Sequence, residues 1–191
     1  MIIARTREDL SKTLKQFSQK PGKLALIPTM GNLHDGHLSL VKLAKLNAKK
    51  TITTIFVNPL QFGKNEDYDK YPRTEKTDIQ KLTKEKCDIL FIPTNKNEVF
   101  PENEKLKQIE AGKLGNVLCG KIRPGHFNGV LTVVNKIFEI IKPDIAIFGA
   151  KDYQQQILIK QMAKNLHPSL SLLKAPIIRS KNGVALSSRN N

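Results

Sequence analysis

The sequence predicts an α/β protein in which a parallel sheet is covered by helices on both faces. Short apolar runs, such as LALIP at 24–28 and DIAIFG at 144–149, alternate with segments whose apolar residues recur at helical spacing. Apolar strands separated by amphipathic helices are typical of parallel sheets that are buried on both faces. A chain of 191 residues, 39 % of them hydrophobic, suits one such domain or one domain with part of another.

The first half of the chain is expected to hold three strands and three helices. The first helix is expected over 6–19, because Thr6 can cap it and Leu10, Leu14 and Phe17 share one face. The β-branched run TITTIFV predicts a strand. The expected elements after the first helix are a strand at 24–28, a helix at 37–49, strands at 51–57 and 88–93, a loop at 58–74 and a helix at 75–86.

The second half has the clearest helical period, over 126–141, where Val130, Val134 and Ile137 fall on one side. Residues 94–125 are expected to be mostly irregular, with a short strand near 107–111. The remaining expected elements are a strand at 144–149, a helix at 153–165, strand material at 170–179 and a last short strand at 185–187.

Three polar clusters, at 28–37, 58–73 and 149–155, each follow a predicted strand. In parallel sheets the ligand sits at the carboxyl ends of the strands, where the strand order switches direction. We therefore expect these clusters to share one rim of the sheet.

The first cluster contains His34 and His37 in the sequence HDGH, where the loop turns into a helix. Free N–H groups and the helix dipole favour an anion there, and a protonated imidazole donates from both nitrogens to growing charge. Two ordinary polar loop histidines are the alternative. HxxH alone supplies too few ligands for zinc.

The other clusters also carry groups suited to phosphate. Lys151 is a point charge for phosphate, although Asp152 beside it also fits a plain helix N-cap. The segment with Ser187, Ser188 and Arg189 is either a flexible phosphate-binding loop or a simple serine-rich turn. Asn58 and Gln61 carry amides that can bind hydroxyls or a carboxylate, and Arg123 and His126 precede the clearest helix, where His126 also fits a plain helix start with its ring in water. One of the carboxylates Asp67, Asp69, Glu75 and Asp78 can serve magnesium, although a solvated face explains most of them. A P-loop is absent.

The composition of the chain favours a small anionic substrate over nucleic acid or a membrane as its binding partner. The net charge of +15 favours an anionic substrate, but only six of the 32 basic residues are arginine and aromatic residues make up 6 %, so nucleic-acid binding is not expected. No apolar run approaches the ~20 residues of a membrane span, and MIIARTREDL becomes charged too early for a signal peptide. Cys87 and Cys119 are interpreted as reduced thiols of a cytoplasmic protein.

Six motifs, in this order and at these intervals, resemble the pantothenate synthetase family of pantoate–β-alanine ligases. They are TMGNLHDGHLSL, FVNPLQFG, DYDKYPRT, GKIRPGHFNGV, FGAKDYQQ and LSSRN. HxGH alone indicates only the wider nucleotidylyltransferase superfamily. The resemblance implies a Rossmann-like fold of that HxGH type, in the coenzyme A pathway. It also implies a reaction in which ATP and pantoate form pantoyl adenylate, which β-alanine then converts to pantothenate and AMP.

The same resemblance implies roles for individual residues. His34, His37 and Lys151 would be catalytic, with His37 as proton donor. Gln61 and Gln155 would hold pantoate, Gln61 would also meet β-alanine, and Asn58, Arg123 and His126 would complete the acceptor side. Magnesium would be bound by the ATP phosphates, with Asp78 as a candidate protein ligand. The implied ATP site comprises Met30, Gly31, Asn32, Leu33, His34, Asp35, Gly36, His37, Gly149, Ala150, Lys151, Asp152, Ile178, Leu186, Ser187, Ser188 and Arg189.

The chain departs from the family pattern in two respects. Leu186 stands where the family usually has Met, a swap that conserves volume. In the family the SSRN motif leads into a further domain of roughly a hundred residues, an ordinary size for a small domain. We therefore expect a nucleotide-binding domain at 1–179, with 180–191 as the SSRN loop and the start of a lid domain that is absent. Without the lid we expect this chain to bind ATP weakly and to turn over poorly. The resemblance also implies a homodimer.

The residues leave two other classes of function open. Another HxGH nucleotidylyltransferase would give a nucleotidyl-transfer product, and a basic binding module would bind oligonucleotides without needing His37. An α/β domain with no chemistry is not expected from six ordered motifs.

Overall fold

A computed structural model of the chain describes residues 1–18, 21–63 and 66–190. Within them the structure has one sheet of six strands, in the order β1-β4-β3-β2-β5-β6, and every neighbouring pair is parallel. The strands are β1 (Ile2–Ala4), β2 (Leu24–Thr29), β3 (Lys50–Ile55), β4 (Ile89–Phe91), β5 (Ile145–Gly149) and β6 (Ser171–Ala175). The predicted parallel α/β class is confirmed.

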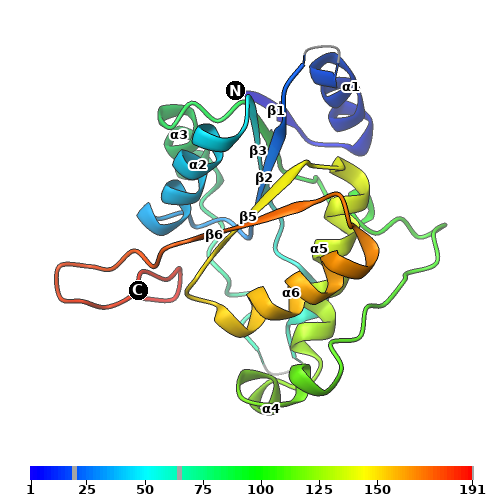
Figure 1. Cartoon of the computed structure of the whole chain (residues 1–191), viewed down its shortest axis with the longest axis vertical. Coiled ribbons are helices and arrows are strands. Elements are labelled where there is room, and N and C mark those ends of the chain that lie inside the picture. The colour runs from blue at the N-terminus through cyan, green and yellow to red at the C-terminus, as the bar shows by residue number, and fades with distance from the viewer. Residues whose placement is uncertain (19–20, 64–65, 191) are drawn as a thin grey trace.

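Helices cover both faces of this sheet (Figure 1). The helices α2 (Asp35–Asn47) and α3 (Glu75–Lys84) pack on one face, and α1 (Arg7–Ser18), α5 (His126–Ile141) and α6 (Tyr153–Leu166) pack on the other. The short helical turns are η1 (Pro59–Gln61), η2 (Lys96–Glu98), η3 (Lys113–Asn116) and α4 (Cys119–Ile122). No helix in the described parts of the chain is long and apolar enough to cross a membrane.

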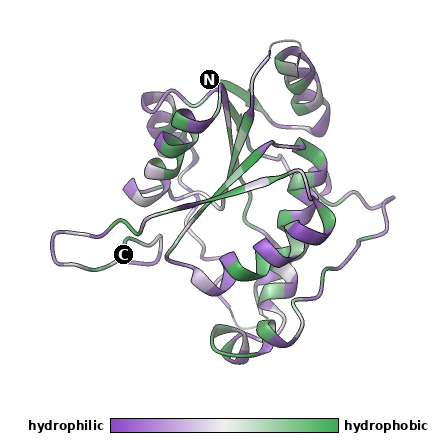
Figure 2. Ribbon diagram, in the orientation of Figure 1, coloured by the Kyte–Doolittle hydropathy of each residue, from purple (hydrophilic) through white to green (hydrophobic). Residues whose placement is uncertain are grey.

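The core has two layers because successive side chains of a strand point to opposite faces. On β2, Leu26 joins the cluster under α5 and α6, whereas Ala25 and Ile27 join the cluster under α2 and α3. Figure 2 shows the strands largely in hydrophobic colours, while hydrophilic residues lie on the outer loops and helix surfaces. Apolar burial on both faces is what keeps the strand ends, and hence the loops after them, in fixed positions.

The predicted elements match the structure closely at most positions. The helix predicted over 126–141 has those bounds in α5, and Thr6 caps α1 by accepting from Asp9 N at 3.1 Å. The predicted end of that first helix at Gln19 lies outside the described residues, as do Lys64 and Asn65 of the loop at 58–74 and Asn191 of the last predicted segment.

Two predictions fail, and one strand of the structure was not predicted. The strand predicted near 107–111 is not formed, because the Ile109 and Ala111 amides donate instead to Thr132 and Asn128 of α5, both at 2.9 Å. The last short strand is reduced to one antiparallel bridge between Arg179 and Ala185. The edge strand β1 has no counterpart among the predicted elements.

The switch in strand order lies between β2 and β5, which pair with each other although other elements separate them in sequence. From β2 the chain moves outward through β3 and β4 on one side, and β5 and β6 continue on the other. The loops that follow β2 and β5 therefore diverge from the carboxyl ends of these two strands and leave a crevice between them. This is where the sequence places its HDGH and AKDY motifs.

Candidate active site

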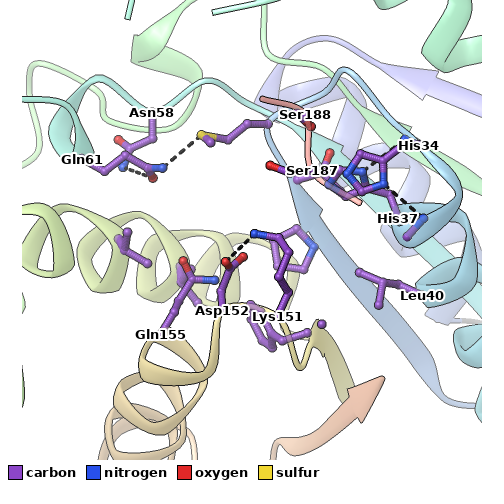
Figure 3. Close-up of a pocket in the computed structure, with 18 of the residues that line it drawn as sticks. His34, His37, Leu40, Asn58, Gln61, Lys151, Asp152, Gln155, Ser187 and Ser188 are labelled. Atoms are coloured by element: carbon purple, nitrogen blue, oxygen red, sulfur yellow. Dashed lines mark hydrogen bonds and ion pairs between the residues drawn. The ribbon is translucent and has the colours of Figure 1, made fainter. Parts of the chain in front are cut away.

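A cavity of about 290 Å³ opens at this crevice. Its volume is at the lower end of the roughly 300–1,000 Å³ of small-molecule sites. Among the segments that line it are 28–30 with His34 and His37, the turn after β3 with Phe56, Asn58 and Gln61, the segment after β5 with Gly149, Lys151, Asp152 and Gln155, and 176–178 with 186–189. The three predicted clusters and the serine-rich segment thus meet in one place, as Figure 3 shows for their labelled members.

His34 and His37 form the first turn of α2. His34 is the N-cap residue, and its Nδ1 accepts from Gly36 N at 3.1 Å. His37 is the third helical residue, and its Nδ1 accepts from His34 N at 3.3 Å. This is the reciprocal arrangement of a capping box, built from two imidazoles in place of Ser and Glu. The ring centroids are 4.1 Å apart.

The capping box assigns the protonation of both rings. Because each Nδ1 accepts a backbone N–H, the proton of a neutral ring is on Nε2, which is left free to donate toward the cavity. Burial, His34, Lys151 and Lys81 lower the pKa of His37 to about 3, and burial followed by Lys151 and Lys81 lowers the pKa of His34. In this arrangement each Nδ1 is already occupied and the lowered pKa values favour the neutral rings; a protonated imidazole that donates from both nitrogens stays a prediction.

The loop before α2 is held in shape by α3. Gly31 and Asn32 have φ angles of 81° and 49°, in the left-handed region. The buried carboxylate of Asp78 accepts from Asn32 N at 2.9 Å and from Leu33 N at 2.8 Å. Thr74 Oγ1 donates to the same carboxylate at 3.1 Å. The strained turn is thus stabilised by one buried anion.

This placement favours a positioning role for Asp78 over the predicted magnesium role, because both oxygens of a carboxylate that is 1 % exposed already accept hydrogen bonds. Residues 1–18, 21–63 and 66–190 contain no group of three or more His, Cys, Asp or Glu that could hold a metal ion. The cavity lining contributes one carboxylate, Asp152, which pairs with Lys151. These residues do not build a metal site of their own.

Lys151 and Asp152 follow β5 and face the histidines across the cavity (Figure 3). Lys151 Nζ lies 2.7 Å from Asp152 Oδ1. Asp152 occupies the N-cap position of α6 but makes no side-chain cap hydrogen bond, so its carboxylate is engaged by Lys151 instead.

The buried amides Asn58 and Gln61 lie in the turn after β3. Asn58 Nδ2 donates to Gln61 Oε1 and to Gly129 O, both at 3.1 Å, and Gln61 Nε2 lies 3.0 Å from Met30 Sδ. A Cβ on Gly129 would lie 2.1 Å from Leu60 O, so only glycine lets η1 approach α5 this closely. The Gln61 amide therefore has a fixed place at the cavity wall.

Arg123 and His126 are linked to each other below these amides. Arg123 Nη1 lies 2.9 Å from His126 Nε2, and His126 Nδ1 lies 2.8 Å from Gln61 O. A neutral His126 that donates from Nδ1 and accepts at Nε2 satisfies both contacts. Burial lowers the pKa of His126, in agreement with that state.

The segment 186–189 lies against the loop before α2. Ser188 Oγ donates to Asn32 O at 3.0 Å, and Asn32 Nδ2 donates to Ser188 O at 3.1 Å. Burial raises the pKa of Tyr71, which is hydrogen bonded to Ser188 and also lines the cavity. Residues 180–190, predicted to begin a second domain, thus reach back to the first; the domain division itself stays a prediction.

Most predicted site residues line the cavity, and six do not. Gly31, Asn32, Leu33, Asp35, Ala150 and Asp78 do not line it. The lining residues among those predicted are Met30, His34, Gly36, His37, Asn58, Gln61, Arg123, His126, Gly149, Lys151, Asp152, Gln155, Ile178, Leu186, Ser187, Ser188 and Arg189.

Sequence reasoning missed an apolar wall and Tyr71. Val130, Val134 and Ile137 of α5 line the cavity, together with Phe56 and Phe148. The helical period of Val130, Val134 and Ile137 predicts an apolar side, and these residues are indeed buried, so no sequence signal separates a core role from a role in the cavity wall. Tyr71 lies within the motif DYDKYPRT, which was the available signal for it.

Comparison with known proteins places these features in a family. The family described as pantoate-beta-alanine ligase matches residues 2–191. A pantothenate synthetase of Thermoanaerobacter sp. (strain X514) is 47 % identical over 190 residues, with 100 % of this chain and 66 % of the relative covered. One of Neisseria meningitidis serogroup B is 49 % identical over 179 residues, with 94 % and 64 % covered. The chain therefore spans slightly less than two thirds of the length of these curated relatives.

Solved structures agree. The pantothenate synthetase of Thermus thermophilus superposes with a TM-score of 0.91 at 39 % identity, with 100 % of this chain and 67 % of that chain covered. The pantoate-beta-alanine ligase of Francisella tularensis, described as complexed with beta-gamma ATP and beta-alanine, gives 0.92 at 42 % identity, with 100 % and 72 % covered. On the family match and these relatives, this chain belongs to the pantoate-beta-alanine ligase family.

Proposed function

We propose that the chain carries the site for ATP-dependent condensation of pantoate with β-alanine through a pantoyl-adenylate intermediate. The observation that carries the proposal is the capping box of His34 and His37. It occupies Nδ1 of both rings and leaves each Nε2–H available, and both rings line the cavity together with Lys151, which follows the strand on the other side of the sheet's switch point. The Francisella relative described with beta-gamma ATP and beta-alanine supports the same substrates.

In the first step a carboxylate oxygen of pantoate attacks the α-phosphorus of ATP, and the bond to pyrophosphate breaks. Both partners are negative, so the site must offset their repulsion and hold them in line. The histidines and Lys151 would contact the phosphates, and Ser187, Ser188 and Arg189 would close over them from the last segment. Two neutral imidazoles act here as hydrogen-bond donors already aimed before the charge develops.

Pantoate carries hydroxyl groups on a branched hydrocarbon, and the lining matches both parts. The amides of Gln61 and Gln155 would hold the hydroxyls, while Val130, Val134 and Phe56 would contact the methyl groups. In the second step the β-alanine amine attacks the acyl carbon and AMP leaves. Asn58, Arg123 and His126 would complete this acceptor side.

Product analysis tests the reaction. Incubation of the chain with ATP, pantoate and β-alanine should yield AMP and pantothenate in equal amounts, with pyrophosphate. A nucleotidyl-transfer product in place of AMP and pantothenate would instead support another HxGH nucleotidylyltransferase. The alternative to an active ligase is an ATP-binding domain with little turnover, which would bind ATP and form pantothenate slowly.

His37→Ala separates binding from chemistry. We expect it to reduce the rate of adenylate formation more than the affinity for ATP, because a preorganised donor acts mainly on developing charge, with losses of about 10²–10³ in rate for one such donor. Single-turnover adenylate formation and equilibrium ATP binding would measure the two effects. Equal losses in His37→Ala and in His37→Gln, which keeps an acceptor for the His34 amide, would show that His37 only binds.

The metal ion, the cell compartment and the oligomeric state are part of the same proposal. Mg²⁺ would enter with the ATP phosphates, since the cavity lining offers it one carboxylate that Lys151 already engages. We further propose that the protein is a cytoplasmic homodimer. Sedimentation of the purified chain over a range of concentrations would test the dimer.

A further inference from the structure

Two neighbouring carboxylates each hold an arginine of the cavity. Glu66 accepts from Arg123, with Oε1 2.7 Å from Nε and Oε2 2.5 Å from Nη2. Asp67 accepts from Arg189, with Oδ1 2.8 Å from Nη2 and Oδ2 3.2 Å from Nε. Both pairs are bidentate, the geometry in which a guanidinium also receives a substrate carboxylate or a phosphate.

The cavity is built for anions yet carries its own counter-ions. Its described lining includes three permanent cations, Lys151, Arg123 and Arg189. Each of them is paired with a carboxylate of the chain, the first with Asp152 and the other two with Glu66 and Asp67. Glu66 and Asp67 are not themselves among the lining residues, so the arginines connect these carboxylates to the cavity.

Arg123 and the chain segment that carries Arg189 have contacts besides these carboxylates. Arg123 Nη1 also contacts His126 Nε2 at 2.9 Å, and the segment of Arg189 is tied down by the paired hydrogen bonds of Ser188 and Asn32. The pairs are moreover partly open to solvent, with side chains 21 % and 24 % exposed for Arg123 and Glu66, and 47 % and 44 % for Arg189 and Asp67. Exchange of one carboxylate for another oxyanion therefore leaves no buried charge unpaired.

We propose that Glu66 and Asp67 are internal counter-ions that occupy the two arginines until the acid groups of the substrates replace them. Asp67 competes with an ATP phosphate for Arg189, and Glu66 competes with a substrate carboxylate for Arg123. The two residues set substrate affinity by position and charge and do not take part in the chemistry. This inference rests on the proposed function, since that function supplies the phosphate and the carboxylate.

The test compares Asp67→Asn and Glu66→Gln with the wild-type chain. Calorimetric titrations with ATP, pantoate and β-alanine, each alone at one fixed ionic strength, give the affinities. Asp69→Asn is the matched control, because Asp69 is an exposed carboxylate of the same loop whose side chain holds neither arginine. Melting temperatures check that every variant is folded, and Glu66→Asp, which keeps the charge, is the conservative variant.

Asp67→Asn should tighten ATP binding about two- to fivefold, the range that fits an exposed ion pair, and leave the binding of both carboxylate substrates unchanged. Glu66→Gln should tighten one of pantoate and β-alanine about tenfold, in keeping with a more buried, charged hydrogen-bonded pair, and thereby identify which acid Arg123 receives. Asp69→Asn and Glu66→Asp should each stay within about twofold of the wild type, the scatter expected at exposed sites.

Several outcomes would overturn the inference alone. They are unchanged or weaker ATP binding by Asp67→Asn, unchanged or weaker binding of both acids by Glu66→Gln at an unchanged melting temperature, and equal gains from Asp69→Asn, which would indicate general charge repulsion. A wild-type chain that binds neither ATP nor the two acids would overturn the proposed function and this inference with it.

Discussion

Replacement of Asp78 by Asn tests whether this carboxylate holds the loop before α2 or a metal ion. In the structure its two oxygens accept three hydrogen bonds, from Asn32 N, Leu33 N and Thr74 Oγ1. An asparagine offers one oxygen and one NH₂ group in their place. If the oxygen takes the Oδ2 position, it keeps Asn32 N and Thr74 Oγ1, and the NH₂ then points at the donor Leu33 N.

The expected loss follows from that geometry. One buried amide without an acceptor costs about 1–3 kcal/mol, and the two remaining hydrogen bonds lose the contribution of the charged acceptor, so the free energy of unfolding should fall by about 2–4 kcal/mol. Thr74→Val removes one neutral donor from the same carboxylate and should cost about 1 kcal/mol.

Urea unfolding followed by circular dichroism, with EDTA present and nucleotide absent, measures both variants. A metal-free Asp78→Asn protein as stable as the wild type, with a raised magnesium requirement for activity, would refute this reasoning and restore the predicted magnesium role.

Two further predictions concern the same site. His37→Gln keeps an acceptor at the third helical position, as in an ordinary capping box, but removes the titrating ring. Since folding lowers the pKa of His37 from 6.5 to about 3, the unfolded chain binds the extra proton first. Stability should therefore fall as the pH drops from about 6.5 toward 3, by up to about 1.4 kcal/mol per pH unit, and the variant should show a shallower slope in urea titrations across this range. Gly129→Ala places a Cβ 2.1 Å from Leu60 O and 2.7 Å from Gln61 N. The resulting shift of η1 should cost about 1–3 kcal/mol and exceed the helix-propensity gain of about 1 kcal/mol. It should also weaken pantoate binding, whereas Gly149→Ala, which meets nothing within 4 Å, should be no less stable than the wild type in thermal melts; a stabilised Gly129→Ala would contradict the packing argument.

Elements with a strong period were predictable because their own residues determine them. The apolar side of α5 follows from local spacing, and the polar clusters after β2, β3 and β5 meet because parallel strands end at one rim. β1 was missed because a three-residue edge strand, with Ile2 and Ile3 about 40 % exposed, carries almost no pattern.

The contacts that complete the site depend on residues far apart in sequence. Glu66 meets Arg123 across 57 positions and Asp67 meets Arg189 across 122. A single sequence gives no signal for such pairs, so it suggests only a solvated or magnesium-binding role for Asp67 and no role for Glu66. Asp78 was selected for its charge, whereas its actual neighbours are backbone amides of a loop 45 and 46 positions away.

The imidazole capping box has a consequence for how alanine substitutions at this site are interpreted. Removing His34 or His37 deletes a donor to the substrate and, in the same change, exposes an orphan amide at the start of α2. A loss of activity in either variant therefore mixes chemistry with fraying of the helix tip. Only a side chain that still satisfies the amide, such as glutamine at position 37, separates the two contributions.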